Sequence, residues 1–360
     1  MILTTVDTRL AVHTLDPLAD ARWARFLERH PRASVFHTPA WLDALRRTYG
    51  YSPVVLSVSP AGETLDNGLV FCEVDSWLTG RRLVSVPFAD HCDALVDEDS
   101  DADAVLSAMI RKLRYEKLRY AELRTVRFAG ELAGAVRSQH SYYLHRLDLR
   151  PSLDELFRQC HRDSTQRKIR RAEREGLRYE EGISKPYLDA FYSLLITTRR
   201  RHQLPPQPRS WFQNLIAAFG PHLKIRVAFK ENTAVAAILT IRYKDTLYYK
   251  YGCSDERFHN TGAMHLLFWK CIEEGKRDNL RTLDFGRTDL DGAGLVTFKD
   301  RWGGERSVLS YTRFTESESS GDNFGSQRDG WQERTARRLL PRLPGRVLIS
   351  LGELLYRHVG

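Results

Sequence analysis

The chain has 360 residues, of which 42% are hydrophobic and 28% charged, and its formal net charge is +9. This is the composition of a folded protein, so general disorder is excluded. The longest nearly uninterrupted apolar stretch, residues 233–241, is far shorter than the roughly 20 residues of a membrane-spanning helix. The N-terminus lacks the basic start and apolar block of an export signal. We therefore expect a cytoplasmic protein, and at roughly 150 residues per domain the length favours two domains.

The cysteine pattern argues against a disulfide framework or a zinc knuckle. The five cysteines are odd in number, widely spaced and never form a CxxC pair. The one dense group of metal-ligating residues is FADHCD, which contains Asp90 and His91. Adjacent side chains cannot all turn toward one ion without a distant ligand. We expect a loop or the rim of an active site there, with no metal and no bound cofactor.

The positive charge is concentrated in two segments. Residues 158–178 contain eight basic and three acidic residues, and residues 331–360 contain six basic and two acidic residues. These two excesses account for the whole net charge. Such a distribution favours local anionic partners, with a solvated helix face as the alternative for either segment.

The first half of the chain alternates between helical and extended patterns. Thr38 is a favourable N-cap with Pro39 at the first helical position. In chain order, the patterns predict helices at 20–28 and 38–49, strands at 53–59, 68–74 and 81–86, a helix at 101–117, and strands at 120–124 and 142–149.

The second half repeats this order at an offset of 170 residues, because Trp41 and Gly50 are matched by Trp211 and Gly220. The predicted elements are a basic helix at 162–175, a helix at 211–220, strands at 224–229, 235–243 and 246–251, a helix at 261–276, a strand at 282–285 and a last strand at 298–314. We predict a duplicated α/β fold (α+β), each domain a mixed sheet flanked by helices. The boundaries are 1–150 and 151–315, followed by a polar linker at 316–330 and a basic amphipathic tail at 331–360.

Two short motifs resemble those of protein kinases, but their spacing and their neighbouring residues do not support kinase chemistry. HRD at 161–163 and DFG at 284–286 lie much too far apart for a kinase. Lys168 stands where the magnesium-binding Asn of a kinase would be, and no Gly-rich loop precedes the motifs. The chain also contains no P-loop, no GxSxG and no HExxH. ATP hydrolysis, serine hydrolysis and zinc proteolysis therefore have no support.

Several longer segments carry a family resemblance. In order, they are VFHTPAWLDALRRTYGY, SVPFADHCDALV, RKIRRAEREGLRYE, YGCSDERFHNTGAMHLLFWKCIEEG, LDFGRTDLDGAGLVTFKDRWGG and LLYRHVG. Together they resemble the FemAB-like branch of the GNAT acyltransferase superfamily. The resemblance implies tandem GNAT-like domains and an acyltransferase that forms an amide on a sugar- or peptide-linked amine of a cell-envelope precursor. The donor it implies is aminoacyl-tRNA or acyl-CoA.

Acyl transfer to an amine needs an anion-binding pocket for the donor, removal of an amine proton, and support for an oxyanion. GNAT proteins bind donor phosphates at a loop-to-helix junction, where backbone N–H groups attract anions. The corresponding stretch places Arg257, Asn260, Thr261, Gly262 and Ala263 at the donor site. An ordinary capped helix start at Asn260 or Thr261 is the alternative. Arg287 is a further candidate for clamping a phosphate or carboxylate.

The resemblance also suggests catalytic residues. Strand alternation sends Tyr249 and Tyr251 to one face, and Tyr248 and Lys250 to the other. A cleft tyrosine is often the general acid of GNAT enzymes, although core packing is the alternative for this pair. Lys299 corresponds to a family lysine near the donor phosphate and the reacting carbonyl, with a surface lysine as the alternative. We expect it to have an exposed stem. Asp284 ends a strand and is expected to face the ligand crevice.

The acceptor-binding candidates come from both domains. They are Trp41, Asp90, His91, Arg167, Arg170 and Arg171. The rival function is a non-catalytic RNA- or membrane-binding module, in which the basic helix simply grips phosphates. The expected partners are a small or lipid-linked envelope precursor and, with an aminoacyl donor, tRNA.

The tail predicts a short amphipathic helix. Val347, Leu348, Leu351, Leu354 and Leu355 form one apolar stripe. We expect this stripe to dock on the protein's own domains, with an anionic membrane surface as the alternative. The membrane alternative would place the protein at the inner face of the membrane.

Overall fold

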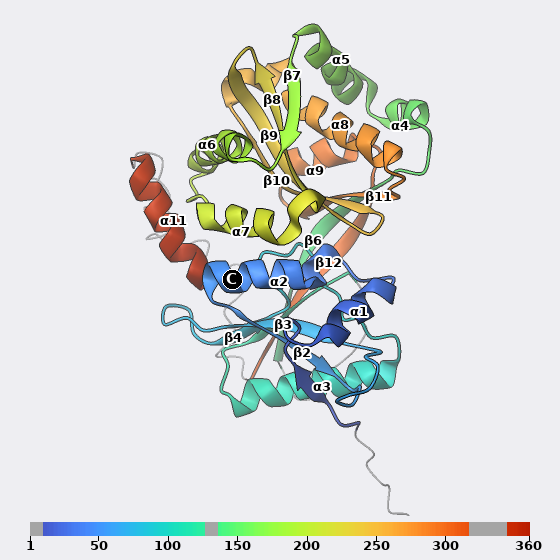
Figure 1. Ribbon diagram of the computed structural model, residues 1–360, viewed down its shortest axis with the longest axis vertical. Helices are drawn as coiled ribbons and strands as arrows, with labels where there is room; N and C mark the ends of the chain where they lie inside the picture. The colour runs from blue at the N-terminus through green and yellow to red at the C-terminus, as the bar shows by residue number, and fades with distance from the viewer. Residues whose placement is uncertain (1–9, 127–135, 317–343) are drawn as a thin grey trace, which may run out of the picture. The chain divides into compact units, whose positions relative to one another are not determined.

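The computed structural model describes residues 10–126, 136–316 and 344–360 (Figure 1). Within them the chain forms two compact units. Unit 1 contains the chain up to His140, the segment that begins at Ser310, and Gly360, while unit 2 begins at Ser141 and includes the helix that ends at Val359. The boundary between the units falls ten residues before the expected one, and the end of the last strand lies in unit 1 rather than in unit 2.

Unit 1 is a mixed sheet with helices. Its elements are β1 (His13–Leu15), α1 (Ala21–Arg29), η1 (Val35–His37), α2 (Pro39–Tyr49), β2 (Ser52–Ser57), β3 (Leu69–Val74), β4 (Arg82–Val84), α3 (Asp99–Tyr115), β5 (Ala121–Thr125) and the end of β12 (Glu305–Thr315). The strand order is β1-β2-β3-β4-β5-β12. Only the β4–β5 pair is parallel among these strands. The three predicted helices of this half are confirmed, whereas β1 was not predicted.

The repeat anchor of unit 1 forms as its sequence requires. The Thr38 side chain accepts a hydrogen bond from the backbone N–H of Trp41, and Pro39 begins helix α2. Gly50 ends the helix with φ of 76°, a left-handed conformation that glycine adopts without steric cost.

Unit 2 contains the second copy of the fold. Its elements are β6 (Val136–Asp148, from Ser141), α4 (Leu153–Gln159), η2 (Arg162–Gln166), α5 (Arg167–Arg174), β7 (Arg178–Gly182), α6 (Lys185–Arg201), α7 (Arg209–Phe219), η3 (Gly220–His222), β8 (Leu223–Lys230), β9 (Thr233–Tyr243), β10 (Thr246–Ser254), η4 (Glu256–Thr261), α8 (Ala263–Arg277), β11 (Thr282–Asp289), α9 (Ala293–Asp300), the start of β12 and α11 (Gly345–Val359). The order β6-β11-β10-β9-β8-β7 runs through its strands. The predicted succession of strands and helices after Trp211 is confirmed, so the fold is a tandem of mixed α/β domains.

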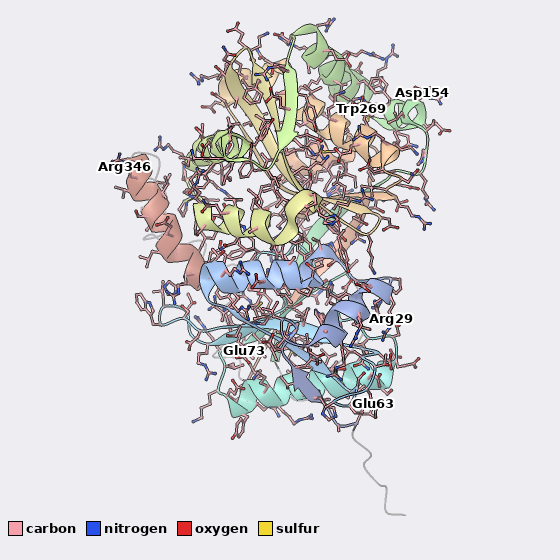
Figure 2. All side chains as sticks on the ribbon, in the orientation of Figure 1. Arg29, Glu63, Glu73, Asp154, Trp269 and Arg346 are labelled. Carbon is pink, nitrogen blue, oxygen red and sulfur yellow. The ribbon has the colours of Figure 1, made fainter. Side chains whose placement is uncertain are left out.

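Helices cover both faces of the unit 2 sheet. Ile238 of β9 belongs to the core beneath α8. Its neighbour Ala237 lies beside Cys253, because the Ala237 carbonyl oxygen accepts from the Cys253 thiol. That thiol also donates to a backbone carbonyl of α6. Successive strand residues face opposite sides, so α6 and α8 lie on different faces, as Figure 1 shows. On α8, Trp269, labelled in Figure 2, makes an edge contact with Phe157 at 5.2 Å.

The prediction of one strand over residues 298–314 is wrong at its start. Residues Ala293–Asp300 form helix α9, and the strand begins at Glu305. Val296 and Lys299, three residues apart, are the buried positions of α9, which is helical spacing. Gly303, with φ of 80°, lies in the turn between helix and strand.

The described part of the tail, residues 344–360, forms helix α11 against the α6–α7 connection. A Cβ atom on Gly352 would collide with the carbonyl oxygen of Pro206, and the Tyr356 hydroxyl donates to the carbonyl of Pro205. The predicted burial of the whole apolar stripe is wrong, because Leu348 is buried but Val347 and Leu354 are 48% and 56% exposed. The close approach at Gly352 turns a different side of the helix toward the protein. The predicted basic residues 331–343 lie outside the described residues.

None of the helices in the described ranges has the length and apolarity needed to cross a membrane.

Candidate active site

Two neighbouring strands of unit 2 part from each other at the centre of the sheet. The parallel strands β10 and β11 are paired only from Thr246 to Tyr248 and from Thr282 to Asp284. Beyond these residues β10 stays with β9, and β11 stays with β6. Both strands are also irregular just past the last shared pair, β10 between Tyr249 and Tyr251 and β11 between Asp284 and Arg287. The parting strands open the sheet on the side where α8 begins.

A cavity of about 600 Å³ lies at this end of α8. Its lining combines basic and apolar side chains with hydroxyl groups and one carboxylate, that of Asp255, which is paired with Arg257. The lining residues are Lys168, Arg201, Val235, Ala236, Tyr249, Ser254, Asp255, Phe258, His259, Ala263, Met264, His265, Gly294, Leu295 and Phe298. Such a volume is typical of small-molecule sites. A ligand with an anionic group and an apolar body fits this lining.

The predicted donor-binding stretch forms the junction between η4 and α8. Gly262 has φ of +85°, and a Cβ atom there would collide with the carbonyl oxygen of Lys168. Glycine is therefore required both by the backbone conformation and by the approach of α5. Of the five predicted residues, Ala263 lines the cavity. Arg257 instead pairs with Asp255 at 2.6 Å, and the hydroxyl of the buried Thr261 donates to Phe258. Asn260 is exposed.

The two candidate tyrosines lie on opposite faces of the sheet, so the predicted shared face is wrong. Tyr249 packs against Phe268 of α8 at 4.8 Å, whereas the Tyr251 hydroxyl accepts from the Trp211 indole of α7 at 2.8 Å. The bulge at Lys250 inserts one extra residue between them and reverses the alternation. Only Tyr249 lines the cavity.

Lys299 and Asp284 meet at one distorted peptide of β11. The Asp284 carboxylate accepts from the backbone N–H of Gly286 at 2.7 Å, and the Lys299 ammonium donates to the Gly286 carbonyl at 2.8 Å. Lys299 also donates to the Arg287 carbonyl at 3.1 Å. The expected exposed stem is wrong, since Lys299 is 2% exposed. Its place on helix α9, not on a strand, turns it inward. These two side chains hold the bend of β11.

The Arg287 side chain lies over the aromatic ring of Tyr142 on the neighbouring strand β6. Its guanidinium is 4.2 Å from the ring centroid of Tyr142, a cation–π contact.

The basic helix presents its arginines to solvent. Arg167, Arg170 and Arg171 are exposed, and Arg171 pairs with Glu175 at 3.3 Å. Lys168, on the same helix, is the residue that lines the cavity.

The remaining acceptor candidates belong to unit 1. Trp41 is fully buried in an edge contact with Phe36 at 4.9 Å, so it presents no surface to a ligand. His91 is 4% exposed and contacts the same Phe36 at 5.3 Å. The carbonyl oxygen of Asp90 accepts from the Tyr311 hydroxyl at 2.9 Å. A role of Asp90 and His91 in acceptor binding stays a prediction, whereas the burial of Trp41 agrees with core packing.

The segment that carries the cavity matches a known family. Residues 159–299 match the family described as Acetyltransferase (GNAT) domain. The UDP-N-acetylmuramoylpentapeptide-lysine N(6)-alanyltransferase of Weissella viridescens is 31% identical over 91 residues, which are 25% of this chain and 27% of that protein. The match thus spans about a quarter of that relative's length. A crystal structure of FemX has a TM-score of 0.65 at 14% identity, covering 83% of this chain and 96% of that one.

Residues 159–299 thus match a GNAT domain, and the chain is similar to Fem-type proteins in sequence over 91 residues and in its fold. A tandem GNAT protein from the clavulanic acid biosynthesis pathway has the same fold, with a TM-score of 0.54 at 12% identity over 87% of this chain and 100% of that one. At such identities the two solved structures establish the fold, which agrees with the duplication seen in the sequence.

The cavity also contains residues that sequence reasoning missed. Ser254, His259 and His265 all line it. His259 lies inside the predicted junction, where its spacing five residues after Ser254 was the available signal. Burial lowers the pKa of His265 to about 3, with smaller contributions from Lys168 and Arg301, so this ring stays neutral. Within the described residues, no group of His, Cys, Asp and Glu side chains is placed to hold a metal ion.

Proposed function

We propose that this protein is an N-acyltransferase that forms an amide on an amine of a peptidoglycan precursor. The observation that carries the proposal is the cavity where β10 and β11 part, at the N-terminus of α8 and beside Lys168 and Arg201. A helix N-terminus and two cations attract the phosphate or other anionic part of a donor. The apolar side of the cavity suits the acyl chain or the body of the donor.

The reaction joins the amine nitrogen to the carbonyl carbon of the donor and breaks the carbon–oxygen bond of an ester or the carbon–sulfur bond of a thioester. The amine loses its proton, and the leaving group gains one. In our proposal Tyr249 supplies that proton, because its ring lines the cavity from β10. The N–H groups of the η4–α8 junction, at Gly262 and Ala263, hold the donor, as the sequence suggested. Lys299 and Asp284 contribute by fixing the shape of β11.

The acceptor class is inferred from the relative of Weissella viridescens, whose name specifies a muramoyl-pentapeptide lysine. The donor is either an aminoacyl-tRNA or an acyl-CoA. Between β7 and α7 the chain forms one helix, α6. The coiled-coil hairpin common in tRNA-using members of the family is not found between these elements, which favours the smaller donor.

We also propose that α11 touches the membrane when the acceptor is lipid-linked. Val347 and Leu354 are exposed and seven residues apart, so they lie on one side of the helix near Arg346. Replacing both by Ser should reduce co-sedimentation with anionic liposomes and leave the melting temperature unchanged. Equal co-sedimentation of the variant and wild type would contradict membrane contact through these two residues.

The experiment for the function uses the full chain with UDP-N-acetylmuramoyl-pentapeptide as acceptor. Alanyl-tRNA and acetyl-CoA are supplied separately, and the acceptor mass is measured. A gain of one alanyl or acetyl group supports the proposal and identifies the donor class. Absence of product with both donors, combined with tight, salt-sensitive RNA or liposome binding through Arg167, Arg170 and Arg171, would favour the non-catalytic binding module instead.

A further inference from the structure

Three cavity residues that were not among the predicted site residues form one hydrogen-bonded group. The Ser254 hydroxyl lies 2.9 Å from the Nε2 atom of His259, and the Arg201 guanidinium lies 3.4 Å from the same Nε2. All three residues line the cavity. They come from the end of β10, from η4 and from α6, so the fold brings them together from separate elements.

The contact with Arg201 favours one tautomer of the histidine. A guanidinium has only donors to offer, so Nε2 is an acceptor here and the ring proton is on Nδ1. The Ser254 hydroxyl then also points its hydrogen at Nε2. Ser254 is itself held on both sides of its backbone, because its N–H donates to the Thr198 hydroxyl at 2.9 Å and its carbonyl accepts from Thr198 at 3.2 Å.

We propose that Ser254 and His259 are the proton-accepting pair of the transfer reaction, with Arg201 as the residue that orients the imidazole and favours the tautomer whose Nε2 accepts. This inference rests on the proposed function and names the base that it lacks. As the amine attacks, the Ser254 oxygen takes the amine proton while its own hydrogen passes to Nε2. Ser254 ends unchanged and His259 becomes an imidazolium.

The charges around His259 favour rapid return to the neutral form. Partial desolvation, and then the Arg201 cation, lower the pKa of His259 below its usual value. Lys168 of α5 acts in the same direction, whereas Glu256 and Asp255 oppose it. The exposed ring releases the proton to solvent. His265, the other cavity histidine, is too weak a base for this role because its pKa is about 3.

The kinetic test uses Ser254→Ala, Ser254→Thr and His259→Gln, with the exposed His222→Gln as control. General-base catalysis contributes about 100-fold or more. We expect Ser254→Ala and His259→Gln each to lower kcat by about 100-fold with the donor KM unchanged, and the double variant to lose no more. Ser254→Thr, which keeps a hydroxyl, should retain most activity. In wild type, kcat should rise with pH through the His259 pKa, and this limb should disappear in His259→Gln. Wild-type kcat and pH profile in both variants would overturn the proposal.

A second readout separates this inference from the proposed function. The His259 pKa is measured by NMR of the ring carbon-bound hydrogens in the free protein. We expect a value below the ordinary histidine pKa of about 6.5, raised by Arg201→Gln. An ordinary His259 pKa that is insensitive to Arg201 would contradict the proposed Ser254–His259 pair, even if amide formation is observed. Failure of wild type to form amide while the pKa behaves as expected would instead count against the proposed acyl transfer.

Discussion

The hydroxyl group of Tyr249 occupies the space that a Cβ atom on Gly252 would fill. The bulge at Lys250 causes this relationship, because it places residues 249 and 252 on the same face of β10. The tyrosine ring, packed on Phe268, is thereby held over the strand at the edge of the cavity.

Gly252→Ala should therefore displace the Tyr249 ring. We expect a loss of about 1–3 kcal/mol in the free energy of unfolding, the usual cost of overpacking, together with slower transfer. In a Tyr249→Phe background the hydroxyl is gone, so the same substitution should cost much less. Chemical denaturation of the four proteins of this cycle measures the coupling. Equal costs in both backgrounds would show that Tyr249 does not lie over Gly252.

The sequence predicted the succession of elements but not this local geometry. The Trp and Gly anchors at a constant offset report whole repeated helices and strands, so the tandem fold followed from them. The prediction assumed a regular strand, in which successive residues face opposite sides of the sheet. Nothing in the Tyr248–Tyr251 sequence indicates the extra residue of a bulge. The error over Tyr251 has that cause.

Helix α9 shows the same limit for Lys299. The stretch around Val296 and Phe298 is apolar and β-branched enough to resemble a strand, and on a strand its lysine would have reached solvent. Tertiary packing makes it a helix and turns the lysine toward the Gly286 carbonyl. His259 was missed because its partners, Ser254 and Arg201, are brought to it only by the fold.

Lys299→Ala should destabilise the protein, unlike a substitution at a surface lysine. It leaves the buried Gly286 carbonyl and the Arg287 carbonyl without the Lys299 donor, and an unmet buried polar group costs about 1–3 kcal/mol. Lys299→Met keeps most of the apolar stem, so it distinguishes the packing of the stem from the hydrogen bonds of the ammonium group. Lys270→Ala, at a partly exposed position of α8, is the control. Thermal denaturation measures all three, and a Lys299→Ala melting temperature equal to that of the control would contradict the buried role.

Stability should fall at acid pH through Glu274. Burial opposes ionisation of this carboxyl, but Arg226 and Lys224, at hydrogen-bond distance, outweigh it and lower its pKa to about 2. A folded-state pKa below the unfolded value of about 4.3 means that the ion pairs stabilise the protein above that pH and lose this effect as the pH falls toward 2. Glu274→Gln should therefore lower unfolding free energy at pH 7, and its difference from wild type should vanish near pH 2.

Glu273→Gln is the matched control, because Glu273 forms only a surface pair with Lys270 at 2.7 Å. Such pairs contribute roughly 0–1 kcal/mol. Urea denaturation between pH 2 and 7 gives both curves. A Glu274→Gln curve parallel to wild type across that range would refute the assigned linkage.

The central claim is that amide formation takes place in the cavity at the start of α8. Leu295 lines the cavity and is 47% exposed, so Leu295→Trp should fill the opening without disturbing the core; Leu290→Trp, at an equally exposed position outside the cavity lining, is the control. The most direct measurement is the mass of UDP-N-acetylmuramoyl-pentapeptide after incubation with each protein and the donor that wild type uses. We predict that wild type and Leu290→Trp add one acyl or aminoacyl group and that Leu295→Trp does not. Equal product from Leu295→Trp would contradict the account.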